Sequence, residues 1–221
     1  MRSVKVWDGA IRLFHLALII TFSLSAYSAF QDKFGIWADV HLWSGLSVLL
    51  LVGWRLVWGL VGSETARFRS FLAAPKHAVG HLITLLRRQQ KTYPYAGHNP
   101  AGGWMVAVML ALLLWQAGAG LFASDDMFFS GPLASMVSED LSGTLTGWHE
   151  LTGFVLFGLI GLHVLAVLVY ALWARVPLIR PMITGRRPLP RSVTAPKLVA
   201  APWALLPLAL VAALIWWGVL A

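Results

Sequence analysis

The chain contains no cysteine among its 221 residues. This absence excludes disulfides, thiol catalysis, iron–sulfur ligation by thiolates and covalent heme attachment through Cys-x-x-Cys-His. Acidic residues are scarce too, with 9 Asp and Glu against 17 Lys and Arg. The resulting formal charge of +8 could indicate nucleic-acid binding, but the positive residues gather in particular segments between apolar runs. That distribution is typical of membrane topology, and we expect no nucleic-acid partner.

Long apolar runs dominate what is present. Hydrophobic residues make up 58% of the chain and charged residues only 12%, unlike a soluble domain. Five runs reach the roughly 20 residues that a helix needs to cross a bilayer, at 10–30, 36–61, 101–123, 148–174 and 198–221. None alternates like a barrel strand, so the fold class is predicted as all-α and integral to a lipid membrane. The first run could be a signal peptide, but Asp8, Arg12 and His15 interrupt it and favour a membrane span.

The loop charges predict an orientation. Basic residues fill the segment between the second and third runs and the segment between the fourth and fifth, at Arg67, Arg69, Lys76, Arg87, Arg88, Lys91, Arg175, Arg180, Arg186, Arg187, Arg191 and Lys197. The other two connections carry Asp32 beside Lys33, and then Asp125, Asp126, Glu139 and Asp140. The positive-inside rule places the N-terminus and the basic segments in the cytoplasm, and the C-terminus in the periplasm.

Within the first basic segment, residues 75–88 have an apolar face with basic flanks. This pattern predicts a short amphipathic helix at the membrane interface. His77 and His81 are spaced i and i+4 and could bind a metal. We favour polar-face positions at the headgroups, because no acid or third ligand lies close in sequence.

Four further histidines lie within the apolar runs, at His15, His41, His149 and His163. His149 and His163 are fourteen residues apart, which on a helix is a rise of roughly 21 Å and a rotation to within about 40° of the starting direction. Both imidazoles would therefore face the same way at different depths. Ionisable groups at membrane depth usually mark function, and neutral imidazole is a good axial ligand for heme iron.

The predicted topology sorts these histidines into two levels. His41 and His149 lie near the outer ends of their runs, whereas His15 and His163 lie about fifteen residues below the outer surface. We therefore predict an outer heme held by His41 and His149 and an inner heme held by His15 and His163. A lone membrane histidine often just hydrogen-bonds a neighbouring helix, but four at matched depths favour ligation. A proton relay would more naturally include membrane Asp or Glu.

Two arginines are candidates to pair with the inner-heme propionates. Arg12 precedes His15 by three residues, and Arg55 follows His41 by fourteen, so both should lie at the inner level. The equal alternative is that both side chains snorkel to the cytoplasmic headgroups.

Several short motifs together resemble the bacterial cytochrome b561 family, whose superfamily includes the membrane cytochrome b subunit of nickel–iron hydrogenases. They are Val-Trp-Asp at 6–8, Arg-Leu-Phe-His at 12–15, Val-His-Leu-Trp-Ser-Gly at 40–45, Arg-Leu-Val-Trp-Gly at 55–59, Gly-His-Asn-Pro-Ala-Gly at 97–102, Trp-His-Glu at 148–150 and Gly-Leu-His at 161–163. The resemblance covers residues 1 to about 187. It implies a four-helix bundle that binds two b-type hemes, with ligands at His15, His41, His149 and His163.

Two segments need separate interpretation. In the motif at 97–102, capping of the third helix by Asn99 is slightly favoured over contact of His98 or Asn99 with heme or quinone. Residues 188–221 depart from the four-helix pattern, as a linker rich in Pro and Arg followed by a fifth apolar run. We therefore predict a diheme domain at 1–187 and an added fifth membrane helix within 188–221.

The resemblance implies a diheme cytochrome of the bacterial inner membrane that transfers electrons in a respiratory chain. Its partners would be the quinone pool and a periplasmic redox protein, such as a cytochrome or an oxidoreductase subunit. One alternative is a self-contained oxidoreductase acting on superoxide, or another small acceptor, with quinone. Others are a hydrogenase-type anchor and electron-transfer subunit, and a membrane anchor without cofactor.

Overall fold

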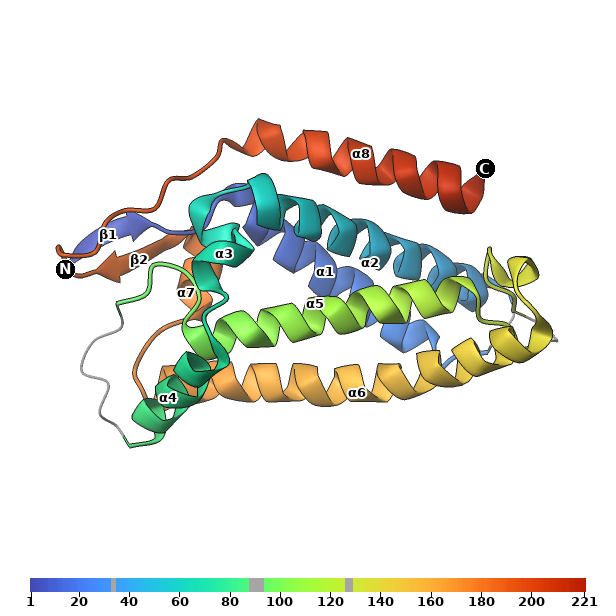
Figure 1. The fold of residues 1–221 in the computed structure, drawn as a ribbon, viewed down its shortest axis with the longest axis horizontal. Helices are drawn as coiled ribbons and strands as arrows, with labels where there is room; N and C mark the ends of the chain where they lie inside the picture. The colour runs from blue at the N-terminus through green and yellow to red at the C-terminus, as the bar shows by residue number, and fades with distance from the viewer. Residues whose placement is uncertain (33–34, 88–93, 126–128) are drawn as a thin grey trace. The chain divides into compact units, whose positions relative to one another are not determined.

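The computed structural model describes residues 1–32, 35–87, 94–125 and 129–221 (Figure 1). Five helical spans in this part of the chain are long and apolar enough to cross a membrane, which confirms the five predicted runs. They are α1 (Gly9–Ser28), α2 (Ile36–Val61), α5 (Pro100–Leu121), α6 (Glu139–Leu172) and the span Ala201–Leu220, which contains α8 (Leu205–Ile215). The loop charges Lys33, Arg88, Lys91 and Asp126 lie outside the described residues.

The chain divides into two compact units. The first unit comprises Met1–Leu13, Leu56–Val108 and Leu159–Leu205. The second unit comprises Phe14–Arg55, Met109–Gly158 and Leu206–Ala221.

In the first unit, the N-terminal strand β1 (Arg2–Lys5) pairs antiparallel with β2 (Arg186–Leu189). Gly185 has φ +74° and terminates α7 (Ile179–Thr184) in the left-handed conformation that glycine favours. Its carbonyl oxygen accepts a hydrogen bond of 2.8 Å from the Val6 amide. Backbone hydrogen bonds thereby join the N-terminal residues to residues 185–189.

Caps and short helices complete this unit. The Asp8 carboxylate accepts a hydrogen bond from the Ile11 amide at 2.7 Å, at the start of α1. Likewise the Asn99 side chain accepts one from the Gly102 amide at 2.8 Å, which confirms Asn99 as the cap of α5. The segment before α5 forms α3 (Phe68–Phe71) and α4 (Pro75–Leu86), and α4 is the predicted short helix.

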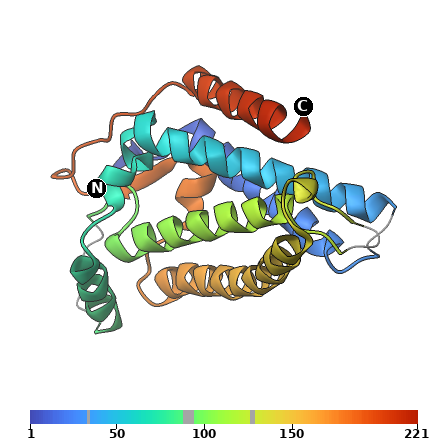
Figure 2. The ribbon, with the colours of Figure 1, turned by 45° about the vertical axis from the view of Figure 1, so that its right-hand side comes forward.

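In the second unit, α8 packs against α2, and Figures 1 and 2 show these two helices running alongside each other. A Cβ added at Gly53 of α2 would lie 2.7 Å from the Val211 Cγ1 atom. Glycine is needed there because a side chain would not fit between the helices.

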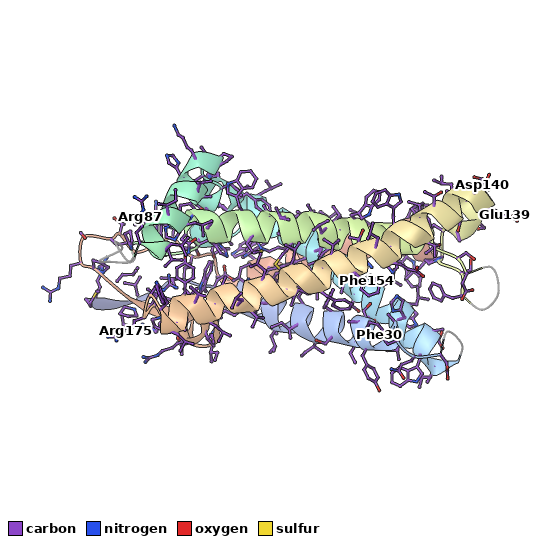
Figure 3. All side chains as sticks on the ribbon, turned by 90° about the horizontal axis from the view of Figure 1, so that it is seen from below. Phe30, Arg87, Glu139, Asp140, Phe154 and Arg175 are labelled. Carbon is purple, nitrogen blue, oxygen red and sulfur yellow. The ribbon has the colours of Figure 1, made fainter. Side chains whose placement is uncertain are left out.

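The helix α6 begins nine residues before the predicted apolar run, at Glu139 instead of 148. Its first turn holds Glu139 and Asp140 (Figure 3), where acidic side chains interact favourably with the helix dipole. The Ser138 hydroxyl accepts a hydrogen bond from the Leu141 amide at 3.3 Å. Glu139 and Asp140 are therefore helical and do not lie in the connecting loop, and His149 lies ten residues into the helix.

Candidate functional site

The structure brings His41 and His149 together in the second unit. Their ring centroids are 6.0 Å apart and their planes are inclined by 84°. His41 lies on α2 and His149 on α6, and both side chains are half-buried. Both rings line one cavity of about 470 Å³.

Residues from α1, α2, α5 and α6 line this cavity, and most of them are apolar. Its volume falls in the range of about 300–1,000 Å³ that is usual for cofactor and ligand pockets. Three carboxylates also line it, those of Asp32, Asp125 and Glu150. No Lys or Arg occurs among the described lining residues.

Backbone carbonyls fix the orientation of both imidazoles. The Nδ1 atom of His41 lies 3.0 Å from the Ser25 carbonyl oxygen and 3.1 Å from the Ser28 hydroxyl. The Nδ1 atom of His149 lies 2.9 Å from the Gln116 carbonyl oxygen. A carbonyl can only accept, so each ring carries its proton on Nδ1 and donates it there. The unprotonated nitrogen is then Nε2 on both rings, as ligation of a metal by Nε2 requires.

The separation of the two rings fits one metal ion between them. Two imidazoles bound on opposite sides of one ion, with bonds of about 2.0–2.1 Å, have their centroids roughly 6 Å apart. The observed distance is 6.0 Å. The donor set, the cavity and the tautomers therefore fit a bis-histidine heme.

Gln116 lies beside the nitrogen that would bind iron. Its side-chain Nε2 is 3.3 Å from the His149 Nε2 atom and can donate a hydrogen bond to it. Its side-chain oxygen Oε1 is buried and has no hydrogen-bond partner among the described residues. Ligation through His149 therefore requires the Gln116 carboxamide to turn away, while the Gln116 carbonyl keeps the ring oriented.

Two other features confine the rings. A Cβ added at Gly120 of α5 would lie 2.9 Å from the His149 Cε1 atom, so only glycine leaves room for this ring. The ring of Phe129 meets His41 edge-on, with centroids 6.2 Å apart. Phe129 is held by a hydrogen bond of 2.8 Å from its amide to the Asp125 carboxylate.

His15 and Arg55 also lie in the second unit, on α1 and α2. The residues that precede them, Phe14 and Trp54, stack with ring centroids 5.4 Å apart. The two helices therefore meet at the level that carries His15 and Arg55. Arg55 is only 2% exposed, so a buried cation is present at this level.

His163 and Arg12 lie in the first unit. His163 is half-buried on α6. The Arg12 guanidinium donates a hydrogen bond to the Ile183 carbonyl in the last turn of α7, where a cation is favoured by the helix dipole. This contact occupies the Nη1 atom of Arg12, and the propionate and headgroup roles of Arg12 stay predictions.

The remaining histidines of the first unit have distinct surroundings. His98 lies between aromatic rings, 4.9 Å from Trp7 and 4.7 Å from Phe71. His77 is exposed, whereas His81 is buried, which corrects the prediction that both occupy a polar face. Within the described ranges no group of three His, Cys, Asp or Glu side chains is placed to hold a metal.

Sequence reasoning missed the residues that orient the rings. Gln116 had a signal, because it interrupts an otherwise apolar helix at membrane depth. Gly120 had a weaker one, since glycine is common in membrane helices. The Ser25 carbonyl had none, because every residue carries a backbone acceptor.

Comparison with known proteins supplies the family. The family described as prokaryotic cytochrome b561 matches residues 6–185. No curated protein and no solved structure gave a significant match. The matched interval covers most of the chain and includes His15, His41, His149 and His163. The chain therefore belongs to the prokaryotic cytochrome b561 family of membrane electron-transfer proteins that bind b-type heme.

Proposed function

We propose that this protein is a diheme cytochrome of the bacterial inner membrane that passes electrons between the quinone pool and a periplasmic redox partner. His41 and His149 ligate the outer heme, and His15 and His163 ligate the inner heme. The four-helix diheme domain spans 1–187, and 188–221 adds the linker and the fifth helix.

One observation carries the proposal most directly. His41 and His149 face one cavity at 6.0 Å, and each donates its Nδ1 proton to a backbone carbonyl. These contacts leave Nε2 as the unprotonated nitrogen on both rings, as two ligands of one metal ion need. His15 on α1 and His163 on α6 would form a second pair at a deeper level of the membrane. Two hemes at two levels would give a transmembrane electron path.

When bound, each heme supplies one-electron redox chemistry at its iron. His41 and His149 would hold the outer heme among mostly apolar side chains, and His15 and His163 would hold the inner heme. With two histidines on each iron, a substrate would find little room at the metal, which would suit electron transfer. Arg55, buried at the level of His15, is placed to neutralise an inner-heme propionate. Arg12 remains a second candidate if its contact with Ile183 opens.

The orientation rests on charge. Glu139 and Asp140 begin α6, whereas Arg175 follows its last residue (Figure 3). By the positive-inside rule the end with Arg175 is cytoplasmic. The N-terminus is then cytoplasmic and the C-terminus periplasmic, and the outer cavity with its three carboxylates faces the periplasm. That sign of charge favours a basic redox partner.

The first test is heme stoichiometry in single variants. Purified wild-type protein should show a reduced b-type spectrum with two hemes per chain. His41→Ala and His149→Ala should each lose the same heme, and His15→Ala and His163→Ala should each lose the other. The exposed His77 offers a matched control, and His77→Ala should keep both hemes. A colourless wild type, or loss in any other pairing, would contradict the proposal.

A self-contained superoxide:quinone oxidoreductase is the second candidate, and a hydrogenase-type anchor and electron-transfer subunit is the third. An assay of the isolated protein distinguishes the enzyme from the relay and the anchor. Rapid heme reduction by superoxide, with quinone as the final acceptor, would support the enzyme, whereas inertness until a redox protein is added would support the relay or the anchor. The three carboxylates that line the outer cavity repel an anion such as superoxide, so the relay is favoured.

A further inference from the structure

The amphipathic helix α4 buries a histidine at a position where an apolar residue would be expected. Its buried residues are His81, which is 7% exposed, and Leu85. Four aliphatic residues point outward instead, at Val79, Leu82, Ile83 and Leu86. An outward aliphatic face is expected for a helix that lies on a membrane surface. Packing alone would be served better by a leucine at position 81, since burial of an imidazole costs free energy.

The buried imidazole meets a buried phenol. The His81 Nε2 atom lies 2.5 Å from the Tyr170 hydroxyl oxygen, and the two rings are nearly parallel, inclined by 11°. Tyr170 is 6% exposed. The ring of Tyr95 also meets His81, at a near-right angle and with centroids 5.5 Å apart. Arg187 donates a hydrogen bond of 3.1 Å to the Tyr95 carbonyl.

The position of Tyr170 on α6 links this pair to the proposed electron path. Tyr170 follows His163 by seven residues on the same helix. Seven residues are two turns, about 10 Å along the axis and about 20° from the same direction. The hydroxyl therefore lies on the His163 face of α6, two turns closer to the cytoplasmic end. In Figure 1, α4 lies beside this end of α6.

We propose that Tyr170 and His81 form a proton-transfer pair that carries protons between a quinone at the inner heme and the cytoplasm. This inference rests on the proposed function, because it requires quinone as the electron donor or acceptor. In quinol oxidation, the O–H bond of the quinol breaks and its proton goes to the Tyr170 oxygen. Tyr170 releases its own proton to His81 Nε2, and His81 releases its Nδ1 proton to water. One electron leaves for the heme path with each proton, and two such steps give quinone.

The chemistry of His81 suits this role. With the proton on Nδ1, its Nε2 accepts the hydrogen bond that the Tyr170 hydroxyl donates. Burial lowers the pKa of His81 below its ordinary value of 6.5, so the ring is a neutral acceptor at pH 7. Of the titratable or charged groups in the described residues, Tyr170 and Tyr95 contact His81, and the exposed His77 lies one turn earlier on α4. Arg187 donates a hydrogen bond to the Tyr95 carbonyl.

The test uses full-length diheme protein in lipid nanodiscs and the rate of heme reduction by a short-chain ubiquinol. Tyr170→Phe keeps the ring but removes the hydroxyl, and His81→Gln removes the imidazole. Both should slow heme reduction roughly tenfold or more, with unchanged heme spectra. The control His77→Gln should match the wild type. The wild-type rate should fall as the pH drops through a pKa below 6.5, and His81→Gln should lack that inflection.

Two further readouts exclude a purely structural role. Imidazole added to His81→Ala should restore the rate, and the infrared difference spectrum of the quinol reaction should lose an imidazole protonation band in His81→Gln. Wild-type rates in both Tyr170→Phe and His81→Gln would overturn the inference. So would slow variants with neither rescue by imidazole nor a changed pH profile. A wild type whose hemes respond to dithionite but not to quinol would overturn the proposed quinone function instead.

Discussion

Histidines are buried in both units of the protein, but a different ring nitrogen is engaged in each. In the second unit, His41 and His149 use Nδ1 for carbonyl oxygens and line a cavity of about 470 Å³. In the first unit, His81 uses Nε2 for the Tyr170 hydroxyl. Binding of a metal by the His81 Nε2 atom would break its hydrogen bond with Tyr170. The local partner of each ring therefore distinguishes the two proposed metal ligands from the proposed proton carrier.

The two units also differ in how they use polar contacts. The first unit fastens distant segments, for example through Thr65, whose hydroxyl donates to the Val6 carbonyl at 2.6 Å. Trp104 donates to the Ala73 carbonyl at 2.9 Å in the same way. The second unit uses its contacts at the cavity to orient rings and keeps the space between them. Variants that fill this space should therefore affect cofactor binding, and variants that loosen the first unit should affect stability or proton transfer.

The largest effect is expected from filling the space beside His149. Gly120→Val places a side chain where a Cβ alone would approach His149 Cε1 to 2.9 Å. Overpacking costs about 1–3 kcal/mol, which corresponds to roughly fivefold to 150-fold weaker heme binding. Gly118→Val is the matched control, because a Cβ there meets nothing within 4 Å. Pyridine hemochrome assays should show about one heme per chain for Gly120→Val at limiting heme and two for Gly118→Val. Equal loss in both would contradict the orientation of His149.

The two arginines provide the next comparison. Arg55→Gln should lower the reduction potential of one heme, because a buried cation near a propionate stabilises the reduced iron. Arg12→Gln should shift neither potential appreciably, because its guanidinium is engaged by the Ile183 carbonyl. It should instead lower stability by about 1 kcal/mol. Potentiometric titration monitored by absorbance measures the first effect, and thermal unfolding measures the second. A larger shift of potential in Arg12→Gln than in Arg55→Gln would reverse the assignment.

The sequence predicted the elements that depend on length and local pattern. The five spans followed from apolar runs of about 20 residues, and α4 from an amphipathic pattern. Asn99 was identified as a cap by its place ahead of Pro100, and the Gly102 amide does donate to it. The start of α6 was wrong by nine residues, because the turns from Glu139 to Gly147 are polar and helical and hydropathy detects only the apolar part.

Contacts between distant segments could not be predicted from local pattern. The orientation of α4 depends on Tyr170, which is 89 residues from His81. The pairing of β1 with β2 joins the N-terminus to residues 186–189. At the cavity, the pairing of His41 with His149 was predicted as a hypothesis, whereas the Gln116 carbonyl and Gly120 appear only when α5 is packed against α6. Four-helix packing and the inner pair stay predictions.

The fifth helix gives a smaller effect, which tests whether the second unit needs α8. Gly53→Ala brings a Cβ to 2.7 Å from the Val211 Cγ1 atom, and we expect a loss of about 1–3 kcal/mol in the free energy of unfolding. The double variant Gly53→Ala with Val211→Ala removes the opposing methyl groups and should recover part of that loss. Thermal unfolding in detergent measures both. Additive losses in the double variant would show that α8 does not pack on Gly53 in solution.

The smallest effect concerns the pH dependence of the Tm, and it tests the burial of His81. Because burial lowers the pKa of folded His81 below 6.5, the unfolded chain binds the proton more readily. Its contribution to stability is full above about pH 6.5 and is lost as the pH falls through that value toward the folded pKa. His81→Phe cannot titrate and keeps a ring against Tyr170. Between pH 7.5 and 5.5, the Tm of the wild type should therefore fall more than that of His81→Phe. Parallel Tm profiles would mean that His81 is as readily protonated in the folded protein as in the unfolded chain, and would contradict the effect of its burial on the pKa.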